Sequence, residues 1–160
     1  MENVIVFDLG GTLMRYEGMP HSWISYYQAA FEAVRDRFNL PLGEEDITRS
    51  VHILREYNPR YKPREIEHSA EFLFGEATRH WNASLPLPEI IDAFFAGIHL
   101  TAKLYGDTLP ALAKLRELGW RTAALTNLPS AMPDRLFRAD IPELLEWLDL
   151  YVSSESCGWR

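Results

Sequence analysis

The sequence predicts an α/β fold built on a parallel sheet, and three observations support this. An unbroken apolar run, Val4 to Phe7, is typical of a strand that is covered on both faces. Two further strand-like segments, residues 121–125 and 148–153, alternate with helical patterns. Between residues 15 and 100, apolar residues recur at helical spacing and are interrupted by Pro and Gly. We therefore expect a parallel core with a helical insertion after its first strand.

The elements can be placed along the chain from these patterns. The first strand covers residues 3–8 and a loop follows to residue 20. A helical pattern opens at His21-Ser22, and the inserted helices are expected over residues 22–38, 44–57, 65–81 and 89–104. The aromatic face of the first helix is expected to be core. After the insertion, the expected order is a helix over 107–118, a strand over 121–125, helical segments over 129–137 and 141–147, and a strand over 148–153.

Polar residues follow two of these strands directly. Asp8 follows the first strand, and Gly10-Gly11 and Thr12 come next, whereas Thr126-Asn127 follows the second strand. In open α/β sheets, ligands bind at the carboxyl ends of the strands. The sequence thus places an acid, backbone amides and hydroxyls where a ligand would bind. We predict that Asp8 lies within hydrogen-bonding or metal-bridging reach of Thr126.

The string Asp8-x-Gly10-Gly11-Thr12-Leu13 resembles the first motif of the haloacid dehalogenase superfamily. The position of Thr126 after the Gly119-Trp120 turn and the next strand resembles that family's second motif. The all-helical insertion is similar to the family's helical-cap branch. The resemblance implies a Rossmann-like core made of residues 1–14 and 101–160, which would be only the N-terminal part of the family's core, and a helical cap over residues 15–100.

The resemblance also implies roles for the site residues. Asp8 would be the catalytic nucleophile and would bind Mg²⁺ together with the backbone carbonyl of Gly10. Gly11, Thr12, Thr126 and Asn127 would bind the transferred phosphoryl group of a small phosphorylated substrate. Fixed donors at these positions would stabilise the charge that develops on the phosphoryl oxygens.

This sequence departs from the family pattern at three places. Gly10 stands where the family's phosphatases have a second Asp as general acid/base, so the usual proton donor is missing. Ser153 to Arg160 resembles the approach to the third motif, whose lysine would come immediately after Arg160. The acidic fourth motif is absent. We therefore expect a fragment, an early-terminated product or a chain that borrows its missing part, with Arg160 as a less favoured substitute for the lysine. An incomplete core would also expose apolar sheet surface and favour self-association.

Three functions remain open at this stage. The first is Mg²⁺-dependent hydrolysis of a phosphate monoester through an aspartyl-phosphate on Asp8. The second is a non-catalytic role for an inactive or truncated protein with the same fold. The third is metal-independent dehalogenation of a 2-haloacid, since the family's dehalogenases also lack the second Asp. Dependence on a metal would separate the first function from the third.

Composition excludes several other classes of function. The formal net charge of the 160 residues is −7, which disfavours binding to a nucleic-acid backbone. No apolar stretch reaches membrane-spanning length, and residues 1–4 do not resemble a secretory signal. Cys157 is the single cysteine, and the five histidines show no metal-ligand spacing. These features favour a cytoplasmic protein that binds neither nucleic acid nor membrane.

Overall fold

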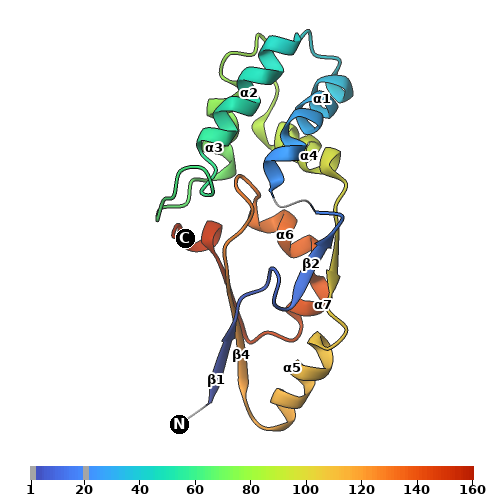
Figure 1. The fold of residues 1–160 in the computed structure, drawn as a ribbon, viewed down its shortest axis with the longest axis vertical. Helices are drawn as coiled ribbons and strands as arrows, with labels where there is room; N and C mark the ends of the chain where they lie inside the picture. Colours follow the sequence, from blue (N-terminus) through green and yellow to red (C-terminus); the bar gives the residue numbers. More distant parts are fainter. Residues whose placement is uncertain (1–2, 20–21) are drawn as a thin grey trace. The chain divides into compact units, whose positions relative to one another are not determined.

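The computed structural model describes residues 3–19 and 22–160, and the chain divides into two compact units (Figure 1). The first, here named the core unit, comprises Met1–Gly18, Leu100–Leu128 and Pro133–Arg160. The second, the helical unit, comprises Met19–His99 and Pro129–Met132. Each unit is described separately below.

A parallel sheet forms the centre of the core unit, as the sequence predicts. Its strands are β1 (Val4–Phe7), β4 (Arg121–Thr126) and β5 (Leu150–Ser153), and their order is β1-β4-β5 (Figure 1). The register pairs the last residue of β1 with Ala124 and the last residues of β4 and β5 with each other. The carboxyl ends of the three strands therefore meet at one edge of the sheet.

Helices cover one face of this sheet. They are α5 (Thr108–Glu117), α6 (Asp134–Asp140) and α7 (Pro142–Leu145) (Figure 1). Phe137 of α6 stacks on Tyr151 of β5 with ring centroids 6.5 Å apart. Arg116 of α5 donates a hydrogen bond of 3.2 Å to the carbonyl of Glu146, just after α7. The connections from β1 to β4 and from β4 to β5 therefore place their helices on the same face.

An antiparallel pair of short strands lies at the two ends of the insertion, where the sequence prediction was wrong. β2 (Met14–Glu17) pairs with β3 (Thr101–Leu104). The sequence predicted no strand between residues 15 and 100 and a helix that continued to residue 104. Instead, α4 ends at Ile98 because His99 adopts a left-handed conformation with φ 51°. The helical insertion thus follows β2 rather than the first strand.

The helical unit contains the four predicted inserted helices, with shorter bounds at several ends. Its elements are η1 (Trp23–Tyr26), α1 (Tyr27–Phe38), α2 (Glu44–Glu56), α3 (Ala70–Thr78) and α4 (Leu87–Ile98). The third helix starts later than predicted because Ser69 caps it, accepting a hydrogen bond of 3.2 Å from the amide of Phe72. His21, at the predicted start of the first helix, lies outside the described residues. In the described part of the chain, no helix is long and apolar enough to cross a membrane.

An aromatic cluster fills the core of the helical unit. Phe31 of α1 lies 4.8 Å from Phe94 of α4, between ring centroids, and Phe74 of α3 lies 5.0 Å from Phe94. All three side chains are buried. The prediction that the aromatic face of the first helix is core is confirmed for Tyr27 and Phe31, whereas Trp23 and Tyr26 are half-buried. Gly97 lets α4 approach α1 closely, since an added Cβ would lie 2.8 Å from the Cβ of Ala33.

Candidate functional site

Asp8 and Thr126 meet at the carboxyl edge of the parallel sheet. Asp8 follows β1 and its carboxylate is exposed, whereas Thr126 ends β4 and is buried. The Thr126 hydroxyl donates a hydrogen bond of 3.0 Å to Oδ1 of Asp8. The predicted proximity of these two side chains is therefore confirmed. Their catalytic roles remain predictions.

The loop after Asp8 is closed by its own backbone. The carbonyl of Leu9 accepts hydrogen bonds from the amides of Thr12, Leu13 and Met14 at 2.9–3.1 Å. The amide of Gly11 donates to the carbonyl of Met14 at 2.8 Å, and φ is +82° at this glycine, a value that favours glycine. The amides of Gly11 and Thr12, which the sequence suggested for a ligand, are thus partners of the loop itself. The Thr12 side chain lies exposed beside them.

A buried threonine fixes the far end of this loop. The hydroxyl of Thr108 donates a hydrogen bond of 2.6 Å to the carbonyl of Leu13, and the amide of Tyr105 donates to the same carbonyl at 3.2 Å. The predicted helix over residues 107–118 corresponds to α5, and Asp107 is its N-cap residue. The structure shows that Asp107 makes no side-chain cap and that the Thr108 hydroxyl instead anchors the loop after Asp8.

The loop after Thr126 is held by the C-terminal segment. Helix α8 (Ser154–Cys157) supplies the hydroxyl of Ser154, which accepts a hydrogen bond of 3.1 Å from the amide of Leu128. The guanidinium of Arg160 donates to the carbonyl of Leu128 at 3.0 Å. Asn127, which lies between Thr126 and the anchored Leu128, is exposed. Arg160 therefore lies beside the loop that follows β4, and its role as a substitute for the family's lysine stays a prediction.

Sequence reasoning missed a polar network next to β5. Asp134 accepts hydrogen bonds through Oδ1 from the Tyr151 hydroxyl at 2.7 Å and from the Ser153 hydroxyl at 2.6 Å. Burial, together with the bond to Asp134, raises the pKa of the Tyr151 hydroxyl above its usual value. Asp134 is the first residue of α6, where an acidic side chain is favoured by the helix dipole, so its identity carried no signal that would connect it to the sheet.

The donors around Asp8 suit a hard cation only in part. In the described residues, no group of three His, Cys, Asp or Glu side chains gathers in a way that could hold a metal ion. Mg²⁺ is commonly bound by one or two carboxylates, several waters and substrate phosphate oxygens. The exposed carboxylate of Asp8 is an oxygen donor of the kind that Mg²⁺ prefers, and metal binding by Asp8 and the backbone carbonyl of Gly10 stays a prediction.

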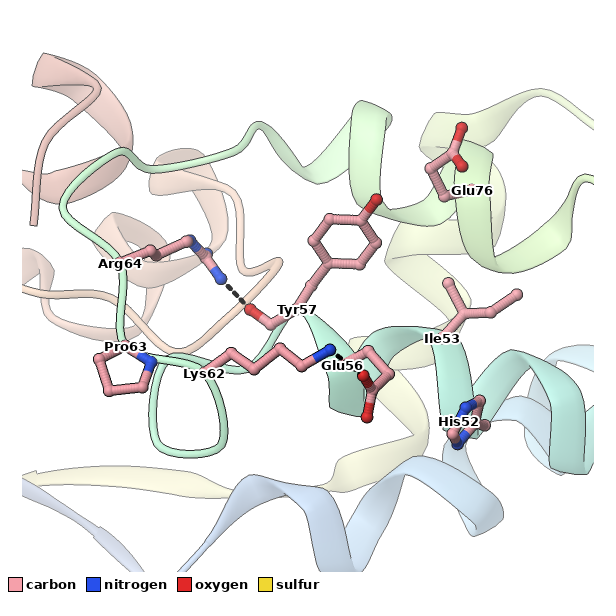
Figure 2. Close-up of a pocket in the computed structure, with 8 residues that line it drawn as sticks. All are labelled: His52, Ile53, Glu56, Tyr57, Lys62, Pro63, Arg64 and Glu76. Carbon is pink, nitrogen blue, oxygen red and sulfur yellow. Dashed lines mark hydrogen bonds and ion pairs between the residues drawn. The ribbon is translucent and has the colours of Figure 1, made fainter.

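A separate pocket of about 590 Å³ lies in the helical unit (Figure 2). Its lining is mixed in charge and comes from α2, α3 and the loop between them: His52, Ile53, Glu56, Tyr57, Lys62, Pro63, Arg64 and Glu76. Figure 2 shows Lys62 paired with Glu56 and Arg64 directed at the backbone carbonyl of Tyr57. Arg64 also forms a largely buried ion pair of 2.5 Å with Glu67. Lys62 and Arg64 are therefore occupied by contacts within the helical unit, and this pocket contains none of the predicted site residues.

Several solved structures resemble this chain in fold. A haloacid dehalogenase-type phosphatase from Thermococcus onnurineus shares 16% identity with a TM-score of 0.49, over 98% of this chain and 63% of the phosphatase. CbbY from Rhodobacter sphaeroides, solved in complex with phosphate, shares 18% identity with a TM-score of 0.46, over 96% and 64% of the two chains. A dehalogenase shares 18% identity with a TM-score of 0.44, over 99% and 64%. This chain thus spans less than two thirds of the length of each.

Family membership follows from the sequence as a whole. Curated proteins give no match to the chain. Residues 2–158 match the family of haloacid dehalogenase-like hydrolases, which is nearly the full length of the chain. The parallel sheet β1-β4-β5, with Asp8 at its carboxyl edge and a helical insertion after β2, agrees with a partial core of that family. The chain belongs to the haloacid dehalogenase-like hydrolases.

Proposed function

We propose that this chain carries the nucleophile of a phosphate monoester hydrolase and that Asp8 is that nucleophile. The observation that supports this most directly is the hydrogen bond of 3.0 Å from Thr126 to Asp8 at the carboxyl edge of a parallel sheet. The bond involves Oδ1 of an exposed carboxylate. We assign the attack to the second oxygen, Oδ2.

In the first step, Oδ2 of Asp8 attacks phosphorus, and the bond from phosphorus to the ester oxygen breaks with its electron pair on the leaving group. In the second step, water attacks the phosphorus of the aspartyl-phosphate, which releases inorganic phosphate and restores the carboxylate. The Thr126 hydroxyl, next to Asp8, is within reach of a phosphoryl group held by the same carboxylate. Such donors stabilise charge on the phosphoryl oxygens. When bound by Asp8 and the carbonyl of Gly10, Mg²⁺ would neutralise charge on the phosphate.

Gly10 limits the substrates that this site would hydrolyse. Because glycine has no side chain, it offers no proton to the leaving oxygen. Aryl and acyl phosphates need no such proton, since their leaving groups are stable anions. We therefore propose a small phosphorylated molecule with a good leaving group as the preferred substrate class.

The test is release of phosphate from p-nitrophenyl phosphate by the whole chain, with Mg²⁺ and with EDTA. We expect slow release that requires Mg²⁺ and is abolished by Asp8→Asn, which keeps the shape of the side chain but not its nucleophilicity. Activity that persists in Asp8→Asn would overturn the proposal. The absence of any release by the folded wild-type chain would favour the non-catalytic alternative.

Gly10 also supports a second candidate, hydrolysis of a 2-haloacid. Here Asp8 would attack carbon, halide would leave with the electron pair of the carbon–halogen bond, and water would hydrolyse the resulting ester. Halide needs no proton on departure, so glycine at position 10 suits this reaction. Chloride release from 2-chloropropionate in EDTA would favour this candidate over phosphate ester hydrolysis.

A further inference from the structure

Asp134 marks the end of the loop that follows Thr126. β4 ends at Thr126 and α6 begins at Asp134, so this loop comprises residues 127–133. Oδ1 of Asp134 accepts hydrogen bonds from the Tyr151 hydroxyl at 2.7 Å and from the Ser153 hydroxyl at 2.6 Å. Hydrogen bonds to a charged acceptor are roughly twice as strong as neutral ones. One carboxylate therefore ties the end of the loop firmly to two residues of β5.

The bond to Ser153 connects this carboxylate to the candidate site. Ser153 ends β5 and is the register partner of Thr126 on β4. Adjacent strands lie about 4.8 Å apart and paired residues point to the same face, so the two hydroxyls are neighbours at the carboxyl edge. The Thr126 hydroxyl donates to the exposed carboxylate of Asp8, whereas Ser153 is fully buried. The buried Ser153 can therefore influence the site only by fixing the end of β5 beside Thr126.

Ser153 also acts on the start of the loop, through the short helix α8. Oγ of Ser153 accepts a hydrogen bond of 3.1 Å from the amide of Ser156 and thereby caps α8. The first residue of α8, Ser154, accepts a hydrogen bond of 3.1 Å from the amide of Leu128. Asn127 is exposed and directly precedes Leu128 in the chain. The position of Asn127 therefore depends on this series of hydrogen bonds.

We propose that Asp134 is a positioning residue that holds Thr126 and Asn127 in place. It acts through Ser153 and α8, and the inference rests on the proposed function, in which Asp8 takes a phosphoryl group. Donors stabilise a developing charge best when they are fixed before the reaction, and a displacement of about 1 Å can cost about 10²-fold in rate. Removing the Asp134 carboxylate leaves the hydroxyl of the buried Ser153 without its acceptor. The end of β5 and the end of the loop then lose their common anchor.

Steady-state hydrolysis of p-nitrophenyl phosphate by the whole chain tests this role. Asp134→Ala should lower kcat by about 10²-fold and change KM only a few-fold, because the loss affects donors that act in the transition state. Asp134→Asn keeps an acceptor oxygen and should retain most of the wild-type kcat. The matched control is Asp140→Ala, since Asp140 on the same helix accepts a hydrogen bond of 2.7 Å from the Tyr16 hydroxyl. This control should keep the wild-type kcat and KM.

Amide hydrogen exchange, measured by NMR on the same variants, tests the positioning independently of activity. Asp134→Ala should speed exchange of the Leu128 amide by about tenfold or more, through local opening of its bond to Ser154. Exchange of the Ala124 amide, in the central strand β4, should not change, which shows that the variant is folded. Asp140→Ala should leave exchange at both amides as in wild type.

The two measurements separate failure of this inference from failure of the proposed function. If the folded wild-type chain releases no phosphate while Leu128 still responds to Asp134→Ala, the proposed function fails and the positioning of the loop is supported. The inference is overturned if exchange at Leu128 does not change in Asp134→Ala. It is also overturned if Asp134→Ala keeps the full kcat of an active wild type, or if Asp140→Ala lowers kcat as much.

Discussion

The hydroxyl of Thr126 donates to the carboxylate of Asp8 at 3.0 Å, although the two residues are 118 positions apart in the chain. They meet because β1 and β4 are adjacent parallel strands that end at the same edge. The helical insertion separates these residues in sequence, and the sheet brings them together. The proposed roles, Asp8 as nucleophile and Thr126 as hydrogen-bond donor, can each be tested by substitution.

Removing the Thr126 hydroxyl should lower kcat/KM for phosphate ester hydrolysis. Thr126→Val keeps the shape of the side chain and removes the donor, whereas Thr126→Ser keeps the donor. We expect Thr126→Val to lower kcat/KM for an aryl phosphate by about 10²-fold, as for the loss of one fixed donor to a developing anion. Thr126→Ser should stay within a few-fold of wild type. Equal losses in both variants would show that packing, not the hydroxyl, matters at this position.

The anchor on the loop after Asp8 should contribute measurably to stability. Thr108→Val removes the hydrogen bond of 2.6 Å to the carbonyl of Leu13 at a buried position. We expect the free energy of unfolding in urea to fall by about 1–2 kcal/mol. Thr101→Val, on an exposed position of β3, is the control and should change it little. Similar values for the two variants would mean that the Tyr105 amide satisfies this carbonyl alone.

Two glycines in helices of the helical unit should respond oppositely to alanine. At Gly97 a Cβ would lie 2.8 Å from the Cβ of Ala33, so Gly97→Ala should destabilise the chain by roughly 1–3 kcal/mol through overpacking. At Gly75 the nearest atom is a side-chain carbon of Leu87 at 3.8 Å, an ordinary contact. Gly75→Ala should therefore stabilise the chain by about 0.5–1 kcal/mol, since alanine is the better helix former. Thermal unfolding of both variants measures the difference, and a loss at both positions would contradict the close approach at Gly97.

Much of this architecture could be predicted from local patterns, and the failures have physical causes. The run from Val4 to Phe7 and the periodic helices are local signals, so the strands of the parallel sheet and the four inserted helices lie close to their expected places. The pairing of β2 with β3 is not local, because it joins residues such as Met14 and Leu104 that mark opposite ends of the insertion. Their four-residue strands are too short to carry a clear alternation of their own.

In the candidate site, too, some contacts could be predicted from the sequence and others could not. The pairing of Asp8 with Thr126 could be predicted because both follow strands of one parallel sheet. The internal hydrogen bonds of the Gly11 and Thr12 amides could not, since they depend on how the loop folds back onto Leu9 and Met14. Hydrogen bonds between backbone groups cannot be predicted from residue types, because almost every residue has the same backbone amide and carbonyl.

Acid should weaken the contribution of Asp149 to stability. The carboxylate accepts a hydrogen bond of 2.8 Å from the Thr122 amide and pairs with Arg121, and these contacts hold the pKa of Asp149 below its usual value. A depressed folded-state pKa stabilises the fold above the unfolded pKa of about 3.9 and loses that effect as pH falls through the folded pKa. The melting temperature of wild type should thus exceed that of Asp149→Asn at pH 7 and approach it below pH 4. Asp107→Asn, at an exposed carboxylate without a side-chain cap, is the control and should follow wild type at every pH. A difference in melting temperature between wild type and Asp149→Asn that stays constant with pH would show that the charge of Asp149 is not the cause.

Restoring an acid at position 10 should change which phosphate esters are hydrolysed. No atom lies within 4 Å of a Cβ built on Gly10, and its φ is not in the left-handed region, so Gly10→Asp fits without strain. General acid catalysis is typically worth roughly 10²–10⁴-fold, and an alkoxide leaving group needs it most. If Asp8 is the nucleophile, Gly10→Asp should raise turnover of an alkyl phosphate by a factor within that range and change aryl phosphate turnover far less. Gly10→Asn, which has the same size but no acid, should leave both rates near those of wild type. Efficient alkyl phosphate hydrolysis by the wild-type chain would instead show that another residue already supplies the proton, and an equal gain from Gly10→Asn would attribute the effect to loop shape.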